Sequence, residues 1–298
     1  MSSLRIRRPA GGEMTQLADW LEARMIVEGL SRMPRSRLRR YLRGVMAIDK
    51  EELDLQAELL FQEMARRRRI AGEMYPFVEE RTGMGRKDTE AALPYVFLLC
   101  LVTSESLRSE TRQAEVDQML DNLAEDALRR YLAGESRGLR FGWPPSGDRP
   151  GDFRDAVEWL AELLGLRVGK GRRRPKSKDG GVDVVVWRPF KDGREGFITI
   201  LAQCTVALDW EGKGRDIIED IWRGWIDFGK DPVTCLVVPF VIPHPFEKWD
   251  ELRRTVTFVL DRLRLCELLD GVTLSNESEV SEWTAAELGR MGARAREA

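Results

Sequence analysis

The sequence predicts a mixed α/β fold in which a helical N-terminal region precedes a mixed sheet flanked by helices. Residues 178–213 contain two strand patterns joined by a turn at Asp192 and Gly193. Residues 233–238 form an apolar run bounded by prolines, typical of a strand buried on both faces. Before them, apolar side chains recur at helical spacing. We therefore predict a helical domain over 1–110, a mixed α/β domain over 111–245 and a helical C-terminal extension over 246–298.

Helical periodicity predicts helices over 15–30, 35–46, 50–70, 88–105, 111–132, 153–164 and 215–228. A weak strand is expected within 166–178, and residues 256–260 are a further strand candidate in a largely helical 246–269 segment. The helix over 50–70 ends in four arginines, 66–69. A solvated helix end is the favoured interpretation of this run, and nucleic-acid contact is the alternative.

Composition excludes several classes of protein. The only histidine, His244, lies between two prolines, which argues against a histidine base or a histidine-ligated metal. The four cysteines are widely spaced and lack the pattern of a zinc site or disulfide framework, so we predict buried free thiols in a reducing, cytoplasmic compartment. The longest apolar run, 91–102, is too short to cross a bilayer, and no signal peptide is recognisable. No membrane association is expected.

Charge is dense but nearly balanced. The chain carries 48 basic and 50 acidic residues, a formal net charge of −2, so local patches decide what it binds. One patch is a glycine- and proline-containing loop before the two strands. Its basic residues are predicted to contact a phosphate backbone, and they are Arg172, Arg173, Arg174, Lys176 and Lys178.

Two polar side chains stand out on the strands of 178–213. Asp183 is near the start of the first strand and Gln203 near the end of the second, so antiparallel pairing brings them together. Burying both oxygen-bearing groups is costly without a partner, and a divalent cation is one such partner. The structural alternative is that Asp183 caps a glycine turn and Gln203 satisfies backbone groups. The tryptophans nearby, Trp187, Trp210 and Trp222, are predicted core residues.

These residues and the order of elements resemble the PD-(D/E)XK, or restriction-endonuclease-like, superfamily over roughly 113–240. The resemblance implies an αβββαβ core with an acid on the second core strand, matched by Asp183. It implies an acid or glutamine on the third, matched by Gln203 as in relatives that cut modified DNA. The family's lysine two residues later is replaced by Thr205.

The resemblance also implies a cation and a helix acid. Lys213, in WEGK, is the nearest substitute for the missing lysine, and Lys178 is a second candidate. The family's helix acid matches either Asp121 or Glu158, and the apolar stripe around Asp121 favours that residue.

The function implied by this resemblance is Mg²⁺-dependent cleavage of DNA, in a prokaryotic restriction or antiphage system, with Asp183 and Gln203 as metal ligands. The loss of the lysine leaves a second interpretation: a degenerate nuclease fold that binds nucleic acid or serves as an assembly subunit. An RNA nuclease or toxin is the third. A protein partner or homo-oligomer is expected because replacing a glutamate by Gln203 weakens the metal site.

Overall fold

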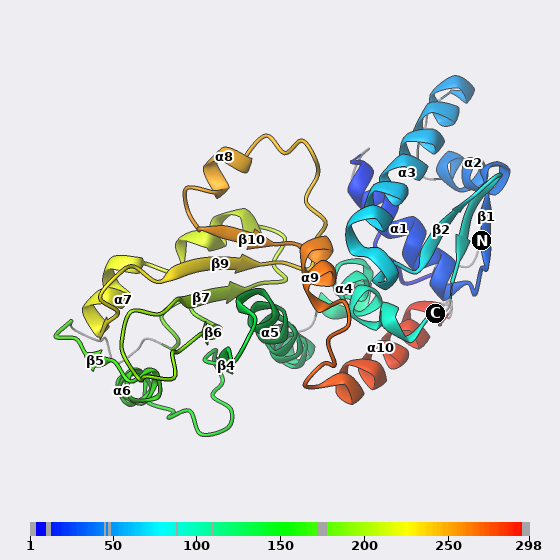
Figure 1. Cartoon of the computed structure of the whole chain (residues 1–298). Coiled ribbons are helices and arrows are strands. Elements are labelled where there is room, and N and C mark those ends of the chain that lie inside the picture. Colours follow the sequence, from blue (N-terminus) through cyan, green and yellow to red (C-terminus); the bar gives the residue numbers. More distant parts are fainter. Residues whose placement is uncertain are drawn as a thin grey trace.

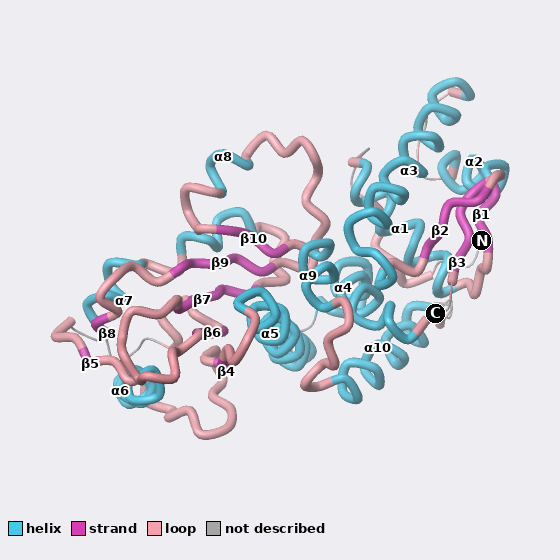
Figure 2. Tube along the Cα trace, in the orientation of Figure 1, coloured by secondary structure: helices cyan, strands magenta, loops and turns pink. Residues whose placement is uncertain are grey.

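A helical region and a sheet region lie side by side in the computed structural model (Figures 1 and 2). The structure describes residues 4–9, 13–44, 46, 49–87, 89–108, 110–171 and 178–293. Helices α5 (Glu110–Leu132) and α9 (Arg262–Leu269) pack against each other between the two regions. None of the helices described is long and apolar enough to cross a membrane.

The helical region is built from both ends of the described chain. It contains α1 (Met14–Val27), α2 (Arg35–Arg43), α3 (Lys50–Ala71), α4 (Leu93–Thr103) and α10 (Glu277–Gly292), with 3₁₀ turns η1 (Gly72–Met74), η2 (Glu90–Ala92) and η3 (Glu105–Arg108). Helix α10, from the segment 246–298, packs on α4 and α1. Pro94 lies in the first turn of α4, where a missing N–H costs nothing.

The first 110 residues are not all helical, contrary to prediction. Strands β1 (Arg32–Pro34), β2 (Phe77–Glu80) and β3 (Gly83–Arg86) form an antiparallel sheet in the order β1-β3-β2. A Cβ on Gly83 would lie 2.0 Å from the Met33 carbonyl oxygen, so β3 approaches β1 this closely only with glycine. Strands of three or four residues are too short to show an alternating pattern.

The arginine run at 66–69 is not simply a solvated helix end. Arg67 is completely buried, and its guanidinium contacts Asp19 at 2.6 Å and Glu22 at 3.1 Å. Arg262 from α9 reaches the same Asp19 at 2.9 Å. This buried charge network joins α1, α3 and α9, and the hydroxyls of Tyr75 and Tyr95 donate to Glu22 within it. One arginine of the four therefore serves the core.

The sheet region is a mixed five-stranded sheet in the order β10-β9-β7-β6-β4. Its strands are β4 (Arg137–Arg140), β6 (Val184–Trp187), β7 (Thr199–Cys204), β9 (Val233–Val237) and β10 (Phe258–Leu260). The β4–β6 and β6–β7 pairs are antiparallel, whereas β7–β9 and β9–β10 are parallel. β10 confirms the strand expected in 256–260, and it places part of the predicted C-terminal extension inside the sheet.

Helices cover both faces of this sheet. On one face Val184 and Val186 of β6 belong to the core cluster that contains α5 and continues into the helical region. On the other, Val185 and Trp187 pack against α6 (Phe153–Leu164) and α7 (Glu219–Trp225). Side chains along β6 therefore alternate between the two faces, and Trp187, Trp210 and Trp222 are buried as predicted.

Two connections differ from the sequence prediction. The strand that pairs with the outer side of β6 is β4. The weak strand expected within 166–178 is the short β5 (Arg167–Val168), which pairs with β8 (Ile226–Asp227) outside this sheet. Where a helix is expected over 215–228, the structure has the shorter α7 followed by β8. The 3₁₀ helix η4 (Trp210–Arg215) precedes them. A short helix α8 (Trp249–Leu252) lies in the connection from β9 to β10.

Candidate functional site

Helix α5 supplies one carboxylate of the candidate site. Its apolar stripe packs on the sheet, and Asp121, only 3% exposed, lies near the start of β6. The Oδ2 of Asp121 accepts a hydrogen bond from Nε of Arg140 at 2.8 Å. Arg140 ends β4 and also donates to the Pro144 carbonyl at 2.6 Å. The pair therefore ties α5 to β4 and to the loop that follows it.

The second carboxylate comes from a bend immediately before β6. Asp183 precedes the first residue of the strand, so its side chain is free of the strict alternation along β6. Its backbone N–H donates to the Ala202 carbonyl at 2.8 Å, and its Oδ2 accepts from the Cys204 N–H at 2.8 Å. Phe141 and Gly142 donate their N–H groups to the Asp183 carbonyl. These contacts fix the carboxylate on the sheet.

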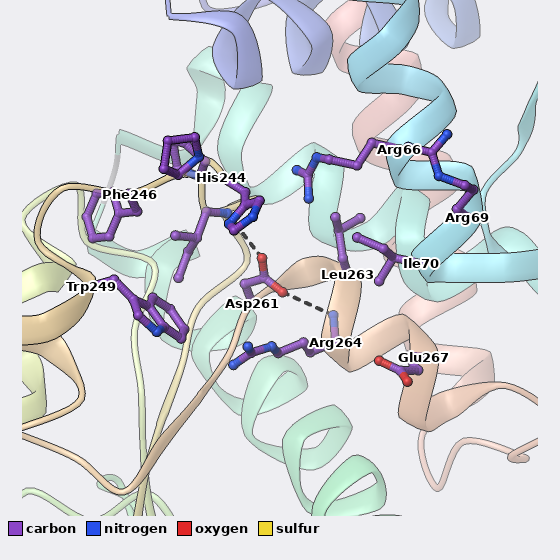
Figure 3. Close-up of a pocket in the computed structure, with 13 residues that line it drawn as sticks. Arg66, Arg69, Ile70, His244, Phe246, Trp249, Asp261, Leu263, Arg264 and Glu267 are labelled. Atoms are coloured by element: carbon purple, nitrogen blue, oxygen red, sulfur yellow. Dashed lines mark hydrogen bonds between the residues drawn. The ribbon is translucent and has the colours of Figure 1, made fainter.

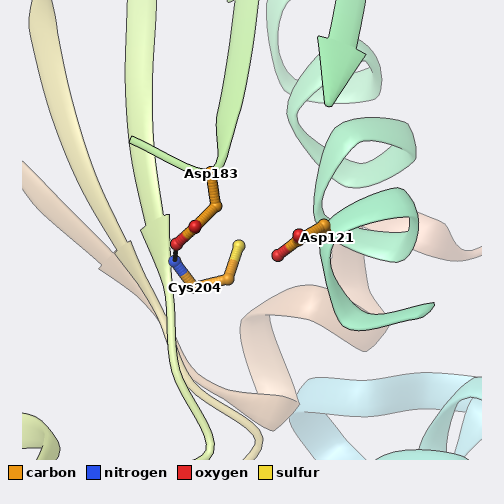
Figure 4. A group of neighbouring side chains, drawn as sticks. All are labelled: Asp121, Asp183 and Cys204. Carbon is orange, nitrogen blue, oxygen red and sulfur yellow. Dashed lines mark hydrogen bonds between the residues drawn. The ribbon is translucent and has the colours of Figure 1, made fainter. Parts of the chain in front are cut away.

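These two carboxylates and a thiol converge on one point. Ligand atoms of Asp121, Asp183 and Cys204 all lie within 4.8 Å of one another (Figure 4). Gly142 lies against one side of this group. A Cβ at this position would be 3.0 Å from Asp183 Oδ1 and 3.3 Å from Asp121 Oδ2. The absence of a side chain at this position leaves space beside both carboxylates.

Burial disfavours negative charge at this site. Desolvation raises the pKa of Asp121 to about 7, although the Arg140 guanidinium opposes the shift. Desolvation, followed by the nearby charge of Asp121, raises the pKa of Asp183 well above its ordinary value. The two carboxylates thus repel each other in an environment that Arg140 alone does not neutralise. A cation between them would relieve that repulsion.

The raised Asp121 pKa predicts a pH-dependent loss of stability in the metal-free protein. Between the unfolded pKa of about 4 and the folded pKa of about 7, the folded state binds the proton more tightly, so the free energy of unfolding falls as pH rises. Urea unfolding of wild type and Asp121→Asn at pH 5 and pH 8 isolates this contribution. The free energy of unfolding of the variant minus that of wild type is expected to be larger at pH 8 than at pH 5. An equal difference at both pH values would contradict the assignment.

Gln203 lies one residue from the thiol. Its Nε2 is 3.4 Å from the Cys204 carbonyl oxygen, and its Oε1 is buried with no hydrogen-bond partner among the described residues. Thr205, at the position of the family's lysine, has a structural role: its Oγ1 accepts from the Ala207 N–H at 3.1 Å. It supplies no positive charge.

The other predicted residues lie in different surroundings. Lys213 forms an ion pair with Asp216 at 3.4 Å on its own segment. The Asp216 backbone packs against Gly181, two residues before Asp183, so this segment adjoins the turn that leads into the site. Glu158 is on α6, where its exposed side chain pairs with Arg154, and of the two helix acids the structure brings Asp121 to Asp183.

The basic loop lies mostly outside the described residues. Four of its residues, Arg172, Arg173, Arg174 and Lys176, are not among the residues that the structure describes. Lys178 is described and exposed, and its carbonyl accepts from Arg149 at 2.6 Å. The prediction that this loop contacts phosphates stays a prediction.

Sequence reasoning missed three residues of the site: Arg140, Gly142 and Cys204. Arg140 is the last residue of β4, and Gly142 lies two residues beyond it. The RGLR segment that forms β4 is short and contains a glycine, so it gave no strand pattern in the sequence. Cys204 was interpreted only as a buried thiol. Its position next to Gln203 at the end of β7 was the available signal.

Comparisons with known proteins add little. No family model matches the chain, and no curated protein matches it. Among solved structures the chain is similar to the MspJI restriction endonuclease in complex with a 27-mer oligonucleotide, at 14% identity and a TM-score of 0.24. That similarity covers 72% of this chain and 43% of the other, so the chain spans less than half the length of its neighbour. Similarity at this level does not define a shared fold.

Proposed function

We propose that this protein is a metal-dependent nuclease that cleaves DNA phosphodiester bonds at the Asp121–Asp183 site. The observation that carries the proposal is the convergence of the buried Asp121 carboxylate and the half-buried Asp183 carboxylate beside Gly142, at the ends of paired strands. Like charges are brought together in this way where a cation is to be bound. A role in a prokaryotic restriction or antiphage system is the biological setting that the sequence resemblance implies.

The residues present fit a divalent cation. Asp121 and Asp183 offer carboxylate oxygens, the ligands that Mg²⁺ prefers, and the buried Oε1 of Gln203 is an oxygen in need of a partner. Gly142 leaves room beside the carboxylates. Sulfur is a poor ligand for Mg²⁺, so Cys204 would flank the ion rather than bind it. When bound, Mg²⁺ supplies a water of lowered pKa and neutralises charge on the phosphate.

The chain's own groups have distinct roles. Asp183 is held by the Cys204 N–H and Asp121 by Arg140, so neither carboxylate needs to reorganise when the ion binds. Lys213 is proposed to approach the scissile phosphate from η4. It would replace the family's lysine, whose position is occupied here by Thr205. The loop basic residues, Arg172 to Lys178, would hold the phosphate backbone on either side.

Cleavage of supercoiled plasmid with Mg²⁺ tests this function. Wild type is expected to nick or linearise the plasmid with Mg²⁺ and to be inactive in EDTA, with a parallel RNA substrate left intact. Cleavage of RNA in preference to DNA would favour the toxin-like alternative. Binding of DNA that is weakened by salt, needs no divalent ion and never leads to cleavage would favour a degenerate nuclease fold that serves as a binding or assembly subunit.

Lys213 provides a sharper test of the proposed cation. Lys213→Ala is expected to reduce the cleavage rate at least about a hundred-fold, because the developing charge on the phosphate loses its partner. DNA affinity should change little. Lys191→Ala is the matched control, since Lys191 is also in an exposed ion pair, with Glu135 at 3.3 Å, on the turn between β6 and β7. Equal rates in the two variants would remove Lys213 from the site.

A further inference from the structure

A separate cavity lies at the junction of the helical and sheet regions. Its volume is about 680 Å³, within the range of pockets for small molecules. It is lined by the C-terminal part of α3, by the loop after β9 and by α9, and it contains none of Asp121, Asp183 or Cys204 (Figure 3). The nuclease proposal does not use this cavity.

Three arginines line the cavity and keep hydrogen-bond donors available. Arg66 engages Glu63 through Nε and Nη2, and its Nη1 has no hydrogen bond to the residues described. Figure 3 shows the Arg66 guanidinium extending from α3 toward the 242–249 loop. Arg69 is exposed and has no ion pair among the described residues. Within the described part of the chain, the Arg264 guanidinium donates only from Nη1, to the Val259 carbonyl at 2.8 Å. Guanidinium groups in this arrangement are suited to a phosphate.

Two carboxylates, Asp261 and Glu267, also line the cavity. Both oxygens of Asp261 are occupied, since Oδ1 accepts from the Arg264 N–H and Oδ2 from the Ile242 N–H. Glu267 is the other acidic residue that lines the space, and it is exposed on α9. A bound anion would meet three arginines and two carboxylates, and both oxygens of one carboxylate, Asp261, already accept hydrogen bonds.

A flat aromatic surface completes the cavity. The Arg264 guanidinium lies 5.0 Å from the centre of the Trp249 ring, so the two planar groups form a platform beside the apolar side chains Ile70 and Leu263. Phe246 and the exposed His244 stand on the same loop. A planar heterocycle would pack on this surface while an attached phosphate reached the arginines.

We propose that this cavity binds a nucleoside phosphate, with the base beside Trp249 and the phosphate at Arg66, Arg69 and Arg264. The bound molecule would contact α3 of the helical region and the loop after β9 together. It would therefore link the two regions that enclose the buried charge network, because α9 carries both Arg264 of the cavity and Arg262 of that network.

Calorimetric titration of the full chain with adenosine 5′-monophosphate tests the proposal, with adenosine and inorganic phosphate as the partial ligands. Wild type is expected to bind the monophosphate with a Kd below about 1 mM and both partial ligands at least about ten-fold more weakly. Arg69→Gln and Trp249→Leu should each weaken binding about ten-fold or more. Glu267→Gln should tighten it, because it removes the opposing charge.

The proposal is overturned by no binding to wild type, by equal binding of inorganic phosphate and the monophosphate, or by unchanged affinity in Arg69→Gln and Trp249→Leu. Arg69 is exposed, so its substitution leaves the fold intact. Asp183→Asn should bind the monophosphate as wild type does, which separates this proposal from the nuclease function. If Arg69→Gln weakens oligonucleotide binding but not monophosphate binding, the surface serves a nucleic-acid strand and the cavity proposal fails.

Discussion

Asp183→Asn is expected to reduce DNA cleavage at least about a thousand-fold while the protein stays folded. In wild type the Cys204 N–H donates to Asp183 Oδ2 at 2.8 Å. Asparagine keeps an oxygen that can accept this hydrogen bond, but it lacks the charge that holds a cation. The unfolding temperature of the metal-free variant should not fall below that of wild type, since a buried charge with a raised pKa has been removed. Plasmid cleavage and thermal unfolding measure the two effects.

Glu158→Gln is the matched control for this experiment. It makes the same carboxyl-to-amide change at the other helix acid, which is exposed and paired with Arg154 on α6. Its cleavage rate should equal that of wild type. Full activity in Asp183→Asn, or a loss in Glu158→Gln as large as that in Asp183→Asn, would contradict the assignment of the site.

Arg67→Met is expected to lower the free energy of unfolding by about 3–5 kcal/mol. The completely buried guanidinium contacts Asp19, Glu22 and Glu63 and also donates to the Thr15 carbonyl. Removing it leaves carboxylates buried without their partner, which costs more than the pair contributes. Urea unfolding with linear extrapolation measures the change.

Arg69→Met is the control for Arg67→Met, because Arg69 lies two residues later on the same helix and is exposed. Its effect should stay within about 0.5 kcal/mol. Adding Glu22→Gln to Arg67→Met should recover part of the loss, since burial already raises the Glu22 pKa and the neutral amide suits that environment. Similar losses in Arg67→Met and Arg69→Met would show that the buried network has no special energetic role.

Sequence patterns were informative where one period extends over many residues. The helix expected over 111–132 is observed as α5, and the two strands of 178–213 are observed as β6 and β7. Their apolar alternation reports burial, which depends mainly on the residues themselves. Asp183 and Asp121 could therefore be placed near the sheet before the structure was known.

The parts that were missed depend on long-range contacts. β4 has four residues and is a strand only because it pairs with β6, so Arg140 and Gly142 could not be assigned to the site. Arg67 looks like its three neighbours in sequence, and only packing of α3 on α1 distinguishes it. The choice between Asp121 and Glu158 likewise required the positions of α5 and α6 on opposite faces of the sheet.

Metal-induced stabilisation tests most directly whether Asp121 and Asp183 form a cation site. Thermal unfolding of wild type with and without Mg²⁺ or Mn²⁺ should show a rise in unfolding temperature, since an ion at about 100 times its Kd adds about 2.7 kcal/mol. The double variant Asp121→Asn, Asp183→Asn should show no rise, and Glu158→Gln should behave as wild type. An unchanged unfolding temperature in wild type at millimolar metal, or an equal rise in the double variant, would contradict the account.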